Sequence, residues 1–180
     1  MSDFTALVNN RQSCRRYKHD SPVSREEIDA CLEMARLSPS ACNSQPWRFY
    51  CADSSEDRAF ISKCVQDLGM NKFADFCSAF VVVTEAPAKM IARLAGSLKN
   101  QQFAQIDVGI AVAHFVLACE ERGLSTCIMG WLDEDKLRKH FDIPQNQRIR
   151  LVIGVGKAED DDPIRNKVRL SLDEIRSWKD

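Results

Sequence analysis

The spacing of apolar positions predicts a chain in which helices alternate with a few strands. Residues 21–40 show helical spacing, with Ser24 as an N-cap and Glu26 and Glu27 following it. Runs rich in β-branched and aromatic residues predict strands. The predicted helices are 2–10, one within 21–40, 54–69, 86–98, 103–122, 133–141 and a short one in the tail 160–180; the predicted strands are 47–52, 78–86, 124–130 and 148–158.

The longest predicted helix covers residues 103–122 and ends before Gly123. At 1.5 Å per residue it is about 30 Å long. Between residues 106 and 119 it is apolar on nearly every face, interrupted only by Asp107 and His114. A helix that is apolar all round is expected to be buried on all sides. In a chain of this size a partner subunit can supply part of that cover, so the pattern favours a homodimer.

The order of these elements predicts an α+β domain around a modest mixed sheet. No repeat, low-complexity tract or long Pro/Gly linker interrupts the chain. Its 180 residues suffice for one well-buried domain and are few for two. We therefore expect residues 1–180 to form a single domain.

Charge and cysteine content narrow the class of protein. The formal net charge is -1, which gives no electrostatic case for nucleic acid. The N-terminal residues do not resemble a signal peptide and no apolar run predicts a membrane span, so we expect a cytoplasmic protein with no membrane partner. Its eight cysteines are then expected to be reduced thiols. No CxxC pair and no clustered histidines occur, so no metal site is predicted.

A basic cluster, "RQSCRRY" at residues 11–17, stands out in this near-neutral chain. In an extended segment Arg11, Ser13 and Arg15 share one face, with two guanidinium groups flanking a hydroxyl. Such a trio suits a phosphate group. The same residues, taken alone, also fit a solvated basic turn after a short helix. Lys167 and Arg169 form a similar pair in the tail, where an exposed charged segment is the simpler interpretation.

Several kinds of chemistry lack their sequence signals. The "GVG" of residues 154–156 lacks the third small residue of a dinucleotide-binding loop, because Glu159 stands there, and no GxxxxGK[ST] loop occurs. Cys42 is a conceivable nucleophile, but no base is evident for it, so a packing role is favoured. His114 is expected to be a hydrogen-bonded interior residue. A phosphate-bearing ligand would therefore have to be held by side chains.

Taken in order, these segments resemble the FMN-dependent, oxygen-insensitive nitroreductase family, in its small branch of about 180 residues. "RQSCRRY" is similar to the opening phosphate motif of that family, and the Asn-x-Gln-Pro-Trp at residues 43–47 is its most specific match. The resemblance continues through "NKFADFCSAFVVV", "GLSTCIMGW", "LVIGVGK" and "NKVRLSLDEI". It implies a three-layer fold, with a central mixed sheet flanked by helices, in an intertwined homodimer.

The resemblance also implies the residues that hold the cofactor FMN. Arg11, Ser13, Lys167 and Arg169 match the residues that bind its phosphate, and Arg15 matches a cation at the pyrimidine edge of the flavin. Met129 and Gly130 match the backbone near flavin N5, whereas Ser40 and Asn43 match positions that reach the FMN of the other subunit. The full predicted set is Arg11, Gln12, Ser13, Arg15, Ser40, Ala41, Asn43, Asn71, Met129, Gly130, Lys167 and Arg169.

The implied activity is reduction of nitroaromatic, quinone or similar acceptors by NADH or NADPH in a ping-pong cycle. No catalytic side chain is required, because the flavin carries the chemistry. Ala74, Met129 and a shortened 71–130 segment depart from well-known members, so the acceptor does not carry over. Two alternatives stay open: a related flavin enzyme that removes halogen or cleaves flavin, and a non-catalytic FMN-binding protein.

Overall fold

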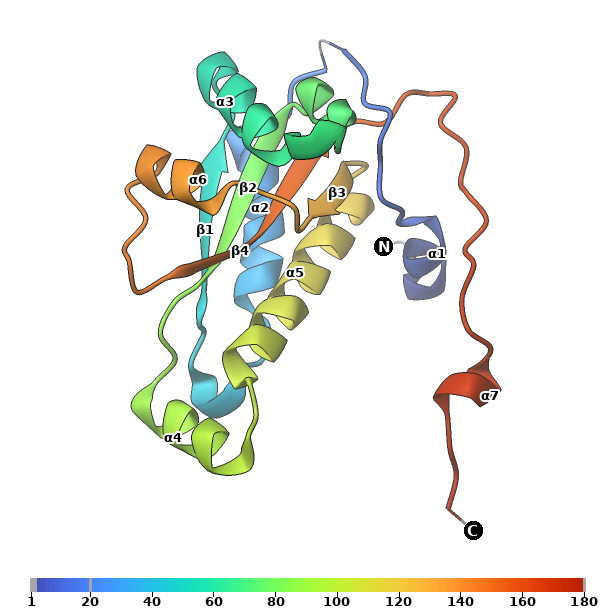
Figure 1. The fold of residues 1–180 in the computed structure, drawn as a ribbon. Coiled ribbons are helices and arrows are strands. Elements are labelled where there is room, and N and C mark those ends of the chain that lie inside the picture. Colours follow the sequence, from blue (N-terminus) through green and yellow to red (C-terminus); the bar gives the residue numbers. More distant parts are fainter. Residues whose placement is uncertain (1–2, 20, 180) are drawn as a thin grey trace.

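The computed structural model describes residues 3–19 and 21–179. Within them, four strands form one sheet in the order β1-β2-β4-β3, and helices cover both of its faces (Figure 1). The elements in chain order are α1 (Phe4–Asn10), α2 (Arg25–Arg36), η1 (Ala41–Asn43), β1 (Trp47–Ala52), α3 (Ser55–Val65), η2 (Asp67–Gly69), η3 (Lys72–Phe76), β2 (Ala79–Glu85), α4 (Met90–Lys99), α5 (Phe103–Glu121), β3 (Ser125–Met129), α6 (Glu134–His140), β4 (Arg148–Gly156) and α7 (Leu172–Ile175).

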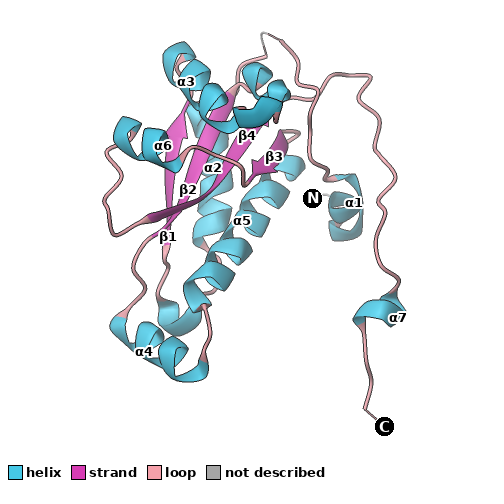
Figure 2. Cartoon of the chain, in the orientation of Figure 1, coloured by secondary structure: helices cyan, strands magenta, loops and turns pink. Residues whose placement is uncertain are grey.

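The three-layer α+β architecture predicted from the sequence is confirmed. Side chains alternate along β2, so Val81 and Val83 face a core built with α2 and α5, whereas Phe80 and Val82 face a second core built with α3, η3 and α6. The α2–α5 pair and the α3–α6 pair lie on opposite faces of the sheet (Figure 2). A sheet covered on both faces explains why β2 is apolar at nearly every position instead of alternating.

The sheet is less mixed than the sequence suggested. Each of the three pairings between its strands is antiparallel. The parallel pairing in the described residues is limited to an isolated bridge between Ser13 and Thr126. The N-terminal segment therefore adds to the edge of the sheet beside β3 without forming a strand of its own.

Most predicted elements occur, with shifted ends. Ser24 caps α2 in a full capping box with Glu27. The third predicted helix ends at Val65 instead of Gly69, because Gln66 leaves the helical conformation and donates to Lys63 O; a separate 3-10 turn, Asp67–Gly69, follows with Leu68 at φ 55°. The fourth starts at Met90, because Lys89 is still extended. The short 3-10 turns were not predicted, and Ser2 of the first predicted helix lies outside the described residues.

The expectation that the long helix is buried all round is wrong for a single chain. Val108, Ala111, Val112 and Phe115 of α5 are buried against the sheet and α2. Ile106, by contrast, is 52% exposed, and Gly109 and Ala113 on the same side are exposed as well. We call Ile106, Gly109 and Ala113 the open face of α5. Both the hydrophobic core and this open face contribute to the apolar pattern of the helix.

Helix α5 also corrects the statement that no apolar segment reaches the length of a membrane span. By length and composition alone, its 19 residues could cross a membrane. Much of the helix, however, is buried inside the domain against the sheet. A helix that packs in the core of a domain needs apolar side chains, so the high mean hydropathy of α5 is explained without a membrane.

The two ends of the chain are joined by complementary charges. Arg16 pairs with Asp161 at 2.8 Å and Lys18 pairs with Asp160 at 2.5 Å. Backbone bonds close the same contact, since Lys18 N donates to Lys157 O at 2.8 Å. Beyond it, the tail runs away from the body towards α7 (Figure 1). One cation of the basic cluster thus already has its anion within the chain.

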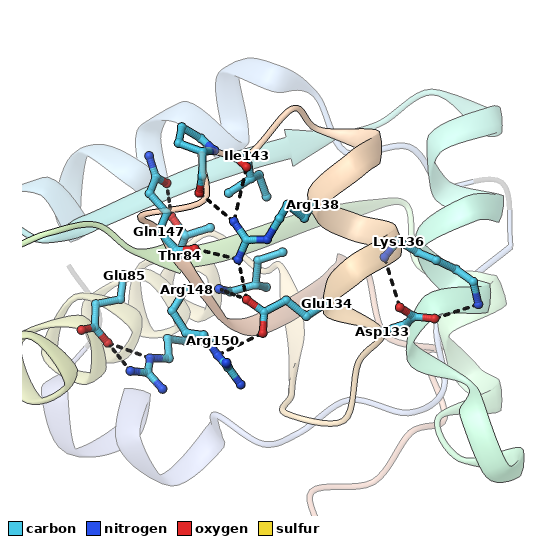
Figure 3. A network of polar contacts seen from close by, with 12 residues as sticks. Thr84, Glu85, Asp133, Glu134, Lys136, Arg138, Ile143, Gln147, Arg148 and Arg150 are labelled. Carbon is cyan, nitrogen blue, oxygen red and sulfur yellow. Dashed lines mark hydrogen bonds and ion pairs between the residues drawn. The ribbon is translucent and has the colours of Figure 1, made fainter.

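A half-buried ion network fixes α6 and the following loop to the sheet. Arg138 donates to Glu134 at 2.6 Å and to the carbonyl oxygens of Pro144 and Gln147 at 2.7 Å each. Glu134 also accepts from Arg148 at 3.0 Å (Figure 3). The Arg138 side chain is only 13% exposed. Its charge is therefore compensated by one carboxylate and by backbone carbonyl oxygens of the following loop.

Arg138→Met is expected to destabilise the fold by about 3 kcal/mol, because it removes the shielded ion pair with Glu134 and leaves the carbonyl oxygens of Pro144 and Gln147 without this donor, although Arg148 still pairs with Glu134. Lys136→Met on the same helix is the matched control. It breaks the Lys136–Asp133 pair, in which the lysine side chain is 67% exposed, and should cost less than about 1 kcal/mol. The measurement is the free energy of unfolding in urea. Equal losses in the two variants would contradict the importance of the network.

Candidate functional site

The segment with Arg11, Ser13 and Arg15 is held rigidly against the edge of the sheet. Cys14 N donates to Thr126 O of β3 at 2.9 Å. The side chains of Cys14 and Tyr17 are buried, and Tyr17 Oη donates to Gly154 O at 3.2 Å. A Cβ atom at Gly156 would lie 2.7 Å from the Tyr17 ring, so a glycine is needed for this close packing. The apolar anchors leave the polar residues between them at the surface.

Arg11 and Lys167 come from opposite ends of the chain and meet near Glu120 of α5. Burial raises the pKa of the Glu120 carboxyl, and the charges of Arg11 and Lys167 act against that rise. Lys167 Nζ also donates to the carbonyl oxygen of Asn9, at the end of α1. The structure therefore brings these two predicted phosphate ligands together.

Ser13 and Arg15 meet at a buried thiol on β3. Burial raises the pKa of Cys127, whereas the Arg15 charge and a hydrogen bond with the Ser13 side chain lower it. The Arg15 guanidinium carbon lies 6.0 Å from the centre of the Phe73 ring. Among residues 3–19 and 21–179, no side-chain hydrogen bond or ion pair occupies Arg11 or Arg15. These two cations are therefore available to an external anion.

Arg165 is a member of this group that sequence reasoning missed. Its Nη1 atom donates to Ser13 O at 3.2 Å, and its Nη2 atom is paired with Asp162 at 2.7 Å. The tail is anchored here by Gln12, whose Oε1 accepts from Arg165 N at 2.9 Å and whose Nε2 donates to Pro163 O at 3.1 Å. The sequence contained a pattern that could have identified it, because Arg165, Lys167 and Arg169 alternate and so share one face of an extended segment.

Arg169 makes a local contact and, among the described residues, no hydrogen bond to Ser13. Its Nη1 atom donates to the neighbouring Val168 carbonyl at 2.7 Å. Arg165, and not Arg169, is therefore the tail arginine that contacts Ser13 in the described part of the chain. Both polar atoms of the Gln12 side-chain amide are hydrogen-bonded to the backbone of the tail, at Pro163 and Arg165. Its contribution in this chain is to position Arg165.

Asn71, Met129 and Gly130 differ in how accessible the structure leaves them. Asn71 is left-handed, with φ 50°, and its Nδ2 atom donates to Val65 O at 2.9 Å. Met129 ends β3 and is buried, whereas Gly130 follows it at the surface. A Cβ atom at Gly130 would have no neighbour within 4 Å. The glycine therefore leaves the peptide after Met129 open to approach.

Ser40, Ala41 and Asn43 lie in a second region, the loop of residues 38–45. Ser40 Oγ accepts from Gln45 N at 2.9 Å and Asn43 Oδ1 accepts from Gln45 Nε2 at 2.7 Å. These bonds leave the Ser40 hydroxyl proton and the Asn43 amide protons available as donors. A Ser–His pair occurs at the start of the loop, with Ser38 Oγ 2.8 Å from His114 Nδ1, but Ser38 is buried. We interpret this pair as a structural contact.

The first region places this chain among proteins in which cationic and hydroxyl side chains from both ends of the chain lie together at the surface. Neither dinucleotide nor nucleotide loops contribute to it, and the described residues contain no cluster of metal ligands. The hydroxyl and guanidinium groups match the donor set that phosphate prefers. This class includes enzymes that bind a phosphate-bearing cofactor.

Comparison with known proteins identifies the family. The model of the "Nitroreductase family" matches residues 8–157, and the chain belongs to this family of oxidoreductases. The "Putative NAD(P)H nitroreductase YodC" of Bacillus subtilis is 24% identical, with 99% of this chain and 100% of that protein covered. An iodotyrosine deiodinase of Thermotoga neapolitana is 25% identical, with 87% and 89% covered.

A solved structure supports the same assignment. The crystal structure of a "putative nitroreductase in complex with FMN" from Exiguobacterium sibiricum 255-15 superposes with a TM-score of 0.83. It is 25% identical, and the match covers 99% of this chain and 98% of that one. The fold and the family are therefore established, and both agree with the resemblance found in the motifs.

Proposed function

We propose that the protein is an FMN-dependent NAD(P)H oxidoreductase whose residues 1–180 form one FMN-binding domain. The observation that carries the proposal is that the two chain ends meet twice: Arg165 contacts Ser13 beside β3, and Lys167 lies with Arg11 near Glu120 of α5. This donor set fits the phosphate of FMN. Membership of the nitroreductase family and the FMN-bound structural relative support the identity of the cofactor.

Each part of the site has a distinct task. Arg11 and Lys167 hold the phosphate together with the Ser13 hydroxyl, and Arg165, which is paired with Asp162, positions Ser13 through its carbonyl oxygen. Arg15 places a positive charge beside the flavin ring, where it stabilises negative charge, and Gly130 lets the backbone approach. When bound, FMN supplies the capacity to accept and donate hydride. No side chain is needed as a nucleophile or general base.

The proposed cycle is ping-pong, in which NADH or NADPH leaves before a nitroaromatic, quinone or similar acceptor binds in its place. We propose that it runs in the cytoplasm in an intertwined homodimer. The open face of α5 supports the dimer, as do large exposed apolar side chains of the tail, among them Val168 at 84% and Trp178 at 81% exposure. Ser40 and Asn43 then complete the FMN site of the partner subunit.

Purification under native conditions tests the proposal. We expect a yellow protein whose released chromophore is FMN, with oxidation of NADH or NADPH that accelerates when a quinone or nitroaromatic compound is added. Protein reconstituted with excess FMN that still binds none would refute the proposed function. Binding of FMN without any oxidation of reduced nicotinamide would indicate the non-catalytic alternative.

A related dehalogenating activity is the second candidate, favoured by the similarity to an iodotyrosine deiodinase over 87% of this chain. The two activities differ in their acceptor. Release of iodide from iodotyrosine by chemically reduced protein, with no turnover of quinones or nitroaromatics, would favour the second candidate.

The cysteines are predicted to take no part in turnover. Cys42→Ser is expected to leave the rate of NAD(P)H oxidation within about twofold, because the proposed mechanism needs no nucleophile. Six of the eight cysteines are buried, and burial raises the pKa of Cys64 to about 11, which keeps that thiol protonated and unreactive at neutral pH. Steady-state kinetics of the FMN-loaded protein provide the measurement. Loss of turnover with FMN still bound would contradict a purely flavin-based mechanism.

A further inference from the structure

The loop of residues 38–45 is held in a conformation that its sequence does not favour. Cys42, Asn43 and Gln45 have φ angles of 53°, 50° and 48°. This left-handed region is unfavourable for residues other than glycine, although asparagine tolerates it. Such a backbone persists only where the surrounding structure enforces it. The contacts that enforce it are therefore important for whatever the loop does.

Two polar side chains of α5 hold one end of the loop. Asp107 accepts from Ala41 N with both carboxylate oxygens, at 3.2 and 3.1 Å, and His114 bonds to Ser38. At the other end, Ser44 Oγ accepts from Lys89 N at 2.8 Å, next to α4. These contacts explain why the otherwise apolar stretch of α5 is interrupted at positions 107 and 114.

Asp107 is the acidic side chain of this group, and it is buried. Its residue is 5% exposed. Burial raises the pKa of its carboxyl, and the bond from Ala41 N acts in the opposite direction. Burial of a carboxylate costs free energy because its charge loses contact with water, and here one backbone donor offsets part of that cost. It also directly follows Ile106 of the open face of α5.

We propose that Asp107 is a positioning residue that fixes the loop so that Ser40 and Asn43 present their donors to the FMN of the partner subunit. This inference rests on the proposed function. In this arrangement the Asp107 carboxylate connects α5, next to Ile106 of its open face, to the loop that would contact the cofactor. The loop is then prepared for the ligand before binding, which reduces the ordering cost of the complex.

The test removes the contact from each side separately. Asp107→Ala deletes the acceptor, and Ala41→Pro deletes the donor. Ala41 is the first residue of η1, a position where proline is tolerated. Each change is expected to weaken FMN binding at least tenfold, equivalent to about 1.4 kcal/mol. The double variant should be no weaker than the stronger single variant, because both remove the same bond. Asp107→Asn, which retains an oxygen acceptor, should bind within threefold of the unmodified protein.

Amide exchange of the protein without FMN measures the contact independently of the cofactor. Exchange at the Ala41 amide should accelerate in Asp107→Ala and remain slow in Asp107→Asn. Val108→Ala is the control for general destabilisation, because Val108 is buried in the core one position further along α5 and has no polar side-chain group to hold the loop. It should lower the melting temperature and leave FMN affinity unchanged.

Clear results would overturn the inference. These are unchanged FMN affinity in Asp107→Ala or Ala41→Pro, additive losses in the double variant, or failure of Asp107→Asn to restore binding. The failure of the proposed function would look different, because the unmodified protein itself would then bind no FMN.

Discussion

Arg11→Ala is expected to weaken FMN binding about ten- to hundredfold. The substitution removes a charged hydrogen bond to the phosphate, worth about 1.5–3 kcal/mol, and every 1.4 kcal/mol changes affinity about tenfold. Lys167→Ala should have a similar effect, since both cations lie by Glu120. Fluorescence titration of the protein without cofactor, repeated at raised salt, provides the measurement.

Arg16→Ala is the matched control, because it removes an arginine from the same motif whose guanidinium already pairs with Asp161. It should leave FMN affinity within threefold. The structure also ranks two residues of the tail. Arg165→Ala should weaken binding more than Arg169→Ala, since only Arg165 contacts Ser13 in the described chain. An unchanged affinity in Arg11→Ala, or the same loss in Arg16→Ala, would show that the phosphate lies elsewhere.

Ala113→Glu is expected to convert the proposed dimer into a monomer and to weaken FMN binding at least a hundredfold. Ala113 lies on the open face of α5, and a carboxylate there would be buried without a partner when two copies associate. The loss of FMN follows because Ser40 and Asn43 of the partner subunit would no longer reach the site. Sedimentation with and without FMN measures both effects, since a cofactor bound by the dimer stabilises it by mass action.

Ala59→Glu is the matched control for this prediction. It places the same side chain on an exposed position of α3, on the opposite face of the sheet. It should remain a dimer with normal FMN affinity. A monomeric Ala113→Glu protein that keeps FMN and full activity would refute the shared site, and with it the roles of Ser40 and Asn43.

The sequence alone determined the elements and the family. Periodicity located the core helices and strands, because burial on one side imposes a repeat of 3.6 or 2 residues on the chain. Local capping signals, such as Ser24 with Glu27, marked where α2 begins. The ordered motifs pointed to the nitroreductase family, which the family model matches over residues 8–157. These features depend on residues that are close together in the chain, so they can be recognised from the sequence without knowledge of the tertiary structure.

Only the tertiary structure decided which polar residues meet. The basic cluster was recognisable, but its division into Arg16, which pairs with Asp161, and Arg11 and Arg15, which remain available, depends on how the two chain ends pack. The same holds for Arg165 beside Ser13 and for Asp107 beneath Ala41. These partners are separated by 152 and 66 positions in the chain, and no local pattern carries information about such distant contacts. Periodicity likewise cannot distinguish an apolar face that packs inside the domain from one left open, because both consist of apolar side chains at the same helical spacing.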